Sequence, residues 1–66
     1  MFHKVMIRKE FGTYYYKKYV DGDLEGVPIY EIYDENKKWL ANVGSFSQVR
    51  EYCMASDKDE YLRVYG

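Results

Sequence analysis

The sequence predicts an α+β fold in which one short helix packs on one face of an antiparallel sheet of four to five strands, in the order β-β-β-β-α-β. Three observations predict it. Several short segments alternate apolar and polar residues and are separated by Gly, Asp and Asn. One later segment has helical spacing after a serine. The length of 66 residues, with one proline and no low-complexity stretch, favours a single domain over residues 1–66.

The first two strands are expected to form a hairpin. Val5 and Ile7 alternate with the other residues of the segment 4–8. Gly12 then interrupts the pattern, and residues 13–20 follow as a run rich in tyrosine, which favours strands.

The third and fourth strands are predicted on either side of a second turn. Residues 21–26 contain an Asp-Gly dipeptide, which tolerates the positive φ of a tight turn, and the strand pattern resumes over residues 27–33. Pro28 lacks a backbone donor and is therefore expected near a strand start or at an edge. A four-residue turn at 34–37 then leads to a strand over residues 38–43.

A helix of about three turns is predicted to begin at Ser45. Ser45 followed by Gln48 is a capping-box pattern, in which the serine oxygen accepts from the amide three residues on and the glutamine reaches back. Phe46, Val49 and Cys53 are spaced i, i+3 and i+7, which gives one apolar stripe.

A last strand is predicted at the end of the chain. Residues 57–59 break the helical pattern, and residues 61–65 then alternate, with tyrosine or arginine at the odd positions. The sequence leaves the place of this strand open, either beside the first strand or at the other edge.

Five apolar residues are expected to share one core, because their strand parities and helical spacing converge on the inner face of the sheet. They are Ile7, Trp39, Phe46, Val49 and Leu62. Phe46→Ala is expected to cost on the order of 3–5 kcal/mol, which would unfold a domain of this size.

Charge varies along the chain although the net charge is −1. Residues 1–20 carry five basic groups and one acid, residues 21–36 carry six acids, and residues 37–66 carry five basic groups and four acids. Two interpretations remain open. Strands of opposite sign pair across the sheet, or a basic patch beside an acidic loop orients a partner.

The residues that support catalysis or metal binding are few. His3 and Cys53 are the only histidine and cysteine, which excludes an internal disulfide and disfavours a zinc site. His3 is expected to be a partly exposed strand residue and Cys53 a buried one. Asp21, Asp23 and Glu25 alternate like the start of a calcium loop, but a solvated turn explains them more simply. No catalytic residue, cofactor or metal is expected, and the protein is predicted not to be an enzyme.

Nine tyrosines are the most distinctive feature of the composition. In the run Tyr14-Tyr15-Tyr16, strand alternation sends tyrosines to both faces, whereas one short helix covers only one face. The uncovered face should therefore be aromatic and basic. The residues expected to bind a partner there are Tyr15, Lys17, Tyr19, Tyr61, Arg63 and Tyr65.

Two functions from different classes follow. The first is a small non-catalytic protein that binds a partner protein through this face, as a regulator or inhibitor of the type encoded by phages and other mobile elements, an origin inferred from size alone. The alternative is a nucleic-acid-binding module in which Tyr15 or Tyr19 stacks on bases. Its phosphate contacts would be Lys17, Lys18, Lys37, Lys38 and Arg63.

The cytoplasm is the expected location. A single cysteine suits a reducing compartment. No apolar run approaches the ~18–20 residues of a membrane helix, and the first residues do not resemble a signal peptide, so no membrane contact is expected.

Overall fold

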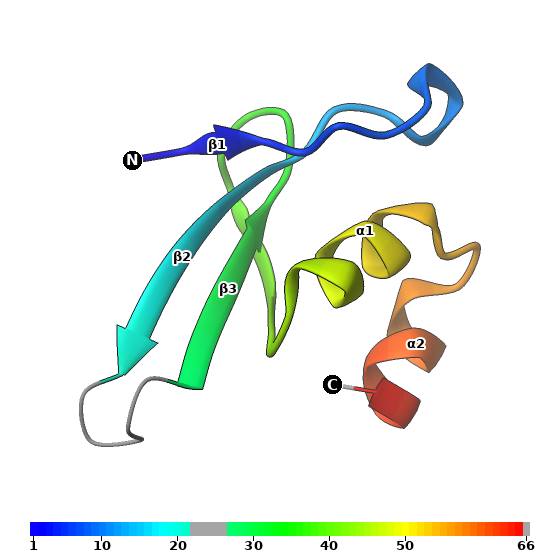
Figure 1. Cartoon of the computed structure of the whole chain (residues 1–66). Coiled ribbons are helices and arrows are strands. Elements are labelled where there is room, and N and C mark those ends of the chain that lie inside the picture. Colours follow the sequence, from blue (N-terminus) through cyan, green and yellow to red (C-terminus); the bar gives the residue numbers. More distant parts are fainter. Residues whose placement is uncertain (22–26, 66) are drawn as a thin grey trace.

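The computed structural model describes residues 1–21 and 27–65, and over these residues it confirms the α+β class. Four antiparallel strands form one sheet in the order β1-β2-β3-β4, and two helices follow (Figure 1). The elements are β1 (His3–Lys4), a 3-10 turn (Lys9–Phe11), β2 (Tyr15–Asp21), β3 (Val27–Tyr33), β4 (Trp39–Val43), α1 (Phe46–Met54) and α2 (Lys58–Tyr65). Residues 22–26 of the predicted turn, including acidic positions 23 and 25 considered for calcium, lie outside the described residues.

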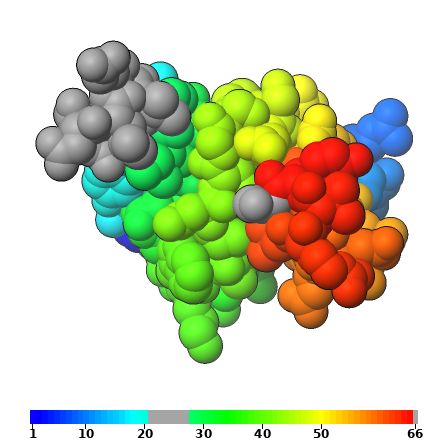
Figure 2. All heavy atoms as spheres, turned by 90° about the horizontal axis from the view of Figure 1, so that it is seen from below, coloured from blue at the N-terminus to red at the C-terminus, as the bar shows by residue number. Residues whose placement is uncertain are grey.

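The two helices lie on one side of the sheet, with α1 between the strands and α2 (Figure 1). Figure 2 shows this arrangement from below, where the yellow-green residues of β4 and the start of α1 lie between the cyan and green of β2 and β3 and the red end of α2. The other face of the sheet, called the outer face below, is therefore left without a covering helix among the described elements.

Strand β1 is shorter than the sequence predicts. His3 and Lys4 pair with β2, and Val5 N donates one further bond to the Tyr14 carbonyl at 2.9 Å. The chain then leaves the sheet for the 3-10 turn, which ends at Gly12 with φ of 91°, a conformation that glycine adopts without strain. The expected strand over residues 4–8 is therefore wrong beyond Lys4, where β1 ends.

Strands β2 and β3 form a long hairpin in continuous register from Tyr15 opposite Tyr33 to Asp21 opposite Val27. Pro28 is the second residue of β3, which confirms its predicted place near a strand start.

Helix α1 begins where the sequence predicts. Ser45 is its N-cap, and the Ser45 hydroxyl oxygen accepts from Gln48 N at 3.2 Å. Gln48 reaches one residue further back than expected, because its Oε1 accepts from Gly44 N at 3.0 Å. This first turn sends Val49 and Cys53 into the core.

The last predicted strand is wrong, because residues 58–65 form helix α2. Asp57 Oδ1 accepts from Glu60 N at 3.0 Å, and Tyr61 N donates to the Asp57 carbonyl at 3.1 Å. Asp57 thus caps the new helix in the way that Ser45 caps α1. In the described part of the chain the sheet ends at β1 and β4, so the question of where a fifth strand lies does not arise.

The core lies between α1 and the inner face of the sheet. Its buried residues are Val5, Tyr30, Ile32, Ala41, Val43, Val49, Tyr52 and Cys53. Of the predicted core, Val49 is fully buried, and Ile7 and Leu62 pack against the core while partly buried. Phe46 lies at the margin, 40% exposed, where its ring contacts those of Tyr16 and Tyr30.

Trp39 does not belong to this core. The register runs from Ile32 opposite Ala41 to Tyr33 opposite Trp39, so Leu40 is an extra residue in β4. This bulge reverses the parity of the strand. It sends Trp39, 55% exposed, to the outer face with Tyr33, while Leu40 packs partly buried against the core.

Candidate interaction surface

Three aromatic rings from three parts of the chain meet on the outer face. The Phe2 ring packs edge-on against Tyr33, with centroids 4.8 Å apart and planes at 85°, and against Tyr15 at 6.3 Å. Tyr15 and Tyr33 are cross-strand partners in β2 and β3, which places their side chains on the same face. Each ring is half-buried by its neighbours, so the group is ordered before any partner arrives.

Two lysines lie over these rings. Lys17 Nζ is 4.4 Å from the centre of the Phe2 ring and 5.4 Å from that of Tyr33. Lys37 Nζ approaches Phe2 and Tyr15 from the β3–β4 turn, at 5.4 and 5.6 Å. A cation over a ring face is attracted by the ring quadrupole. Phe2, Tyr15, Tyr33, Lys17 and Lys37 are called the outer cluster below.

The predicted turn at residues 34–37 is confirmed, and it positions Lys37. Asp34 Oδ1 accepts from the amides of Asn36 and Lys38 at 2.8 and 2.9 Å. Lys37 adopts a left-handed φ of 63°, which a residue with a side chain rarely does. The Asp34 carboxylate holds the turn that allows this conformation.

Glu31 places a carboxylate on the outer face. Tyr33 donates its hydroxyl to Glu31 Oε1 at 2.7 Å, and this bond, with partial desolvation, raises the pKa of Tyr33 to about 12. Partial desolvation and then the Glu31 charge raise the pKa of Tyr19 as well. Both phenols therefore remain neutral donors at physiological pH.

Trp39 extends the surface toward β4. Its indole Nε1 donates to Asn42 Oδ1 at 2.8 Å, which fixes the ring while most of it stays in contact with water. An amphipathic ring held in one orientation is typical of residues that dominate protein interfaces.

The structure brings together only half of the residues predicted to bind a partner. Tyr15, Lys17 and Tyr19 share the outer face, as strand alternation predicted. Tyr61, Arg63 and Tyr65 belong to α2 and lie on the other side of the sheet, because the strand that was to carry them is a helix.

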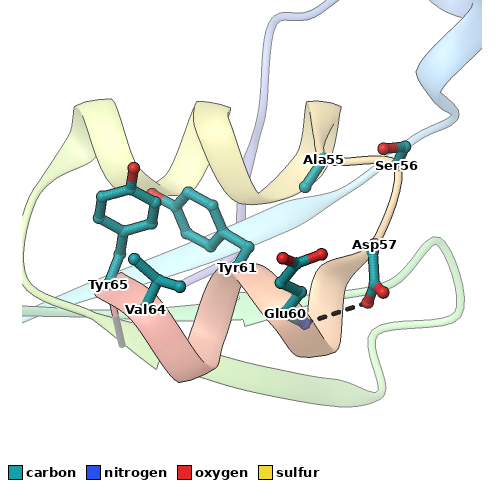
Figure 3. Close-up of a pocket in the computed structure, with 7 residues that line it drawn as sticks. All are labelled: Ala55, Ser56, Asp57, Glu60, Tyr61, Val64 and Tyr65. Atoms are coloured by element: carbon teal, nitrogen blue, oxygen red, sulfur yellow. Dashed lines mark hydrogen bonds between the residues drawn. The ribbon is translucent and has the colours of Figure 1, made fainter.

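The α2 tyrosines have local partners. Tyr61 packs edge-on against Tyr52 and donates its hydroxyl to Glu51 Oε2 at 2.8 Å. Desolvation, followed by this bond, raises the pKa of Tyr61 to about 12. Figure 3 shows Tyr61 and Tyr65 beside each other along an open hollow of about 310 Å³ beneath α1, with Asp57 at its far end. The hollow is open to solvent, and its charged lining residues are two acids, Asp57 and Glu60.

The basic residues considered for phosphate contacts are divided between the two faces. Lys17 lies on the outer face, whereas the neighbouring Lys18 points to the inner face over the Tyr30 ring, at 5.8 Å. Arg63 is on α2. These residues therefore do not form one continuous track for a nucleic-acid backbone.

Cross-strand charge pairing is limited in the described part of the chain. Lys17 is opposite Glu31 in the register, yet it lies over aromatic rings, and the ion pair found within 4 Å among these residues is the exposed Arg8–Glu10. The acidic loop of the second interpretation lies outside the described residues.

The groups with chemical reactivity are not assembled for catalysis. His3 is exposed in β1 and stacks beside Tyr16, as expected of a strand residue. Cys53 is buried, and desolvation raises the pKa of its thiol to about 11 although Lys58 lowers it. Among the described residues, no three of the His, Cys, Asp and Glu side chains converge as metal ligands would.

Sequence reasoning missed Phe2, Tyr33 and Trp39 as members of this surface. Tyr33 could have been predicted from strand alternation. It is two residues from Glu31 and so shares its face, and Glu31 lies opposite Lys17. Phe2 precedes the strand pattern, and the position of Trp39 depends on a bulge that leaves no mark in the sequence of β4 itself.

Comparison of the chain with protein-family models, with curated proteins and with solved structures found no match in any of the three. Neither α1 nor α2 has the length and apolar surface that a membrane crossing requires, within the part of the chain that the structure describes.

Proposed function

We propose that the chain is a small non-catalytic binding protein that recognises a partner protein through the outer face of its sheet. One observation carries this proposal: the outer cluster and Trp39 place ordered aromatic rings and two lysines on a face that no described element covers. Tyrosine and tryptophan are among the side chains that supply most of the energy of protein interfaces.

The side chains of the outer cluster are already held in place, which lowers the entropic cost of binding a partner. A partner that binds a mobile side chain must immobilise it, at about 0.5–1.5 kcal/mol for each rotamer-rich side chain. Here the Phe2, Tyr15 and Tyr33 rings already hold one another, and Trp39 is held by Asn42. Little of this cost remains to be met on binding.

The small size of the chain is the further support for a regulator or inhibitor of the type that phages and other mobile elements encode. The hollow beside Tyr61 and Tyr65 is open to solvent, which suits contact with the surface of another protein better than enclosure of a small substrate.

The test compares Tyr15→Ala with Tyr65→Ala. Both tyrosines are accessible to solvent, but Tyr15 lies on the outer face of the sheet and Tyr65 lies in α2 on the other side. Wild type and both variants are immobilised and exposed to lysate of the source cell, with and without nuclease, and a retained protein is then purified and titrated. We expect Tyr15→Ala to weaken binding by ~1–3 kcal/mol, as truncation of an interface aromatic does. Tyr65→Ala should bind like wild type.

Two results would contradict the proposal. One is equal loss of binding in the two variants. The other is retention that disappears with nuclease, together with an affinity that falls by roughly one power of salt concentration for each phosphate neutralised. That second result, with loss on Lys17→Ala and Lys38→Ala, supports the nucleic-acid alternative.

A further inference from the structure

Two ammonium groups lie near one ring of the outer cluster. Lys17 Nζ is 4.4 Å and Lys37 Nζ is 5.4 Å from the centre of the Phe2 ring, although the two lysines come from β2 and from the β3–β4 turn. Each also lies over a tyrosine ring, Lys17 over Tyr33 and Lys37 over Tyr15. Two positive charges are therefore held close together, at the end of the β2–β3 hairpin where Tyr15 is opposite Tyr33.

Neither charge is paired with a carboxylate of the described residues. The ion pair within 4 Å in that part of the chain is Arg8–Glu10. The acids near the two lysines have other contacts. Glu31 accepts a tyrosine hydroxyl at 2.7 Å, and Asp34 accepts two backbone amides of its own turn. Glu35 lines a separate hollow together with Asp34. The outer cluster therefore presents two cations that internal acids do not neutralise by direct contact.

The chemistry of these contacts favours an anion over a cation as the group that binds here. The faces of the aromatic rings already attract the protein's own lysines, and a cation from a partner would meet two like charges. A ring face does not neutralise an ammonium group, which keeps its N–H donors for a carboxylate. Lys37 is exposed and Lys17 is half-buried, so a carboxylate from outside can reach both.

We propose that the outer cluster binds an acidic segment of the partner protein, in which the carboxylates of Asp or Glu side chains pair with Lys17 and Lys37. This inference rests on the proposed function and names the chemistry of the partner. Charge-assisted hydrogen bonds to the two ammonium groups would fix the position of the segment on the face, and complementary charge would exclude basic partners.

A protein segment fits this charge pattern better than a nucleic acid does. Glu31 is the cross-strand partner of Lys17 and lies on the same face, whereas Lys18 lies on the inner face and Arg63 lies in α2. A nucleic acid carries a phosphate at every nucleotide and is bound most tightly by a continuous row of cations. Two neighbouring lysines match a short segment with two or more carboxylates instead.

The first test uses hexaglutamate, blocked at both ends, as the probe. It is titrated into the 15N-labelled protein at about 0.1 M salt, where charges more than about 10 Å apart are largely screened. We expect the amide chemical-shift changes to be concentrated at the outer cluster, in residues 2, 15, 17, 33 and 37. Hexaglutamine has the same backbone and length without the charge, and it should cause no such changes.

The second test neutralises the lysines one at a time. Lys17→Gln and Lys37→Gln should each raise the dissociation constant of hexaglutamate about fivefold, the effect of one exposed ion pair at about 4 Å in water. Glutamine keeps part of the aliphatic stem over the rings. Lys18→Gln is the matched control on the same strand, and it should leave the dissociation constant unchanged because Lys18 lies over Tyr30 on the inner face.

Three results would overturn the inference. The first is the absence of shifts at the outer cluster with hexaglutamate, and the second is an equal loss of affinity in Lys18→Gln and Lys17→Gln. The third is tighter binding of hexathymidylate than of hexaglutamate at the same residues, which supports the nucleic-acid alternative. The titrations use no partner protein. A retained protein that depends on Tyr15, together with no binding of hexaglutamate, would overturn this inference and leave the proposed function standing.

Discussion

The hydroxyl of Tyr33 shows how a single side-chain hydrogen bond changes the pKa of a residue. A carboxylate that accepts a phenol proton favours the neutral phenol, and this is the main reason why the pKa of Tyr33 rises to about 12. The ordinary value in the unfolded chain is about 10. The stabilisation from this bond is therefore fully present below pH about 10 and is lost as the pH rises toward 12.

Tyrosine absorbance should show this directly. In a spectrophotometric titration, Tyr33 and Tyr61 should ionise at higher pH than an ordinary tyrosine, Tyr33 mainly because it donates to Glu31, and Tyr61 because it is desolvated and donates to Glu51. Tyr33→Phe should remove part of the late absorbance change, and Glu31→Ala should move the Tyr33 pKa back toward about 10. Glu51→Ala is the matched control, which should shift Tyr61 and leave Tyr33 unchanged. A late fraction unaffected by Tyr33→Phe would contradict the assignment.

At the scale of the elements, the sequence predicted best where local chemistry decides. Ser45 caps α1 and Asp34 closes the β3–β4 turn through side-chain bonds to nearby amides, and such short-range signals are legible in one sequence. Strand alternation likewise placed Tyr15 and Lys17 on the outer face.

The two failures have different physical causes. Residues 61–65 fit both the two-residue period of a strand and the 3.6-residue period of a helix. Four of these five residues are apolar or aromatic, so a segment this short does not distinguish the two. The deciding signal was Asp57 followed by Glu60, a helix-capping pattern. The sequence analysis used residues 57–59 only as a break in the helical pattern. The position of Trp39, by contrast, is set by a bulge against β3, which is a property of two strands together.

The cap of α2 can be tested by substitution. Asp57→Ala removes the acceptor for Glu60 N and should lower the free energy of unfolding by about 1 kcal/mol, whereas Asp57→Asn retains an oxygen acceptor and should lower it much less. Denaturant melts monitored by helical circular dichroism measure both. Equal losses in the two variants would mean that Asp57 does not act as a cap.

At the scale of the whole molecule, stability depends on one contact layer. Helix α1 supplies Val49, Tyr52 and Cys53 to a core whose sheet side is centred on Ile32, and α2 packs mainly against α1. A domain of this size rarely has more than ~3–5 kcal/mol of net stability. Truncation of one fully buried side chain should therefore unfold much of the protein, whereas truncation of a side chain at the edge of the core should not.

Ile32→Ala and Phe46→Ala distinguish these two positions. Ile32 is fully buried, so its truncation should cost about 2–5 kcal/mol and leave much of the protein unfolded at 25 °C. Phe46 already has 40% of its surface in water, so its truncation should cost about 1–2 kcal/mol, less than the sequence alone predicts. Urea melts of the two variants give the comparison. A larger loss for Phe46→Ala would place the centre of the core at the start of α1.

The single thiol in this core allows local opening of the protein to be measured directly. Cys53 is 1% exposed, and its raised pKa leaves almost no thiolate at neutral pH. An alkylating reagent can therefore react only during excursions in which α1 lifts from the sheet. The labelling half-life, measured without a denaturant, reports how often these opening events occur, and mass spectrometry of the one modified site gives its value.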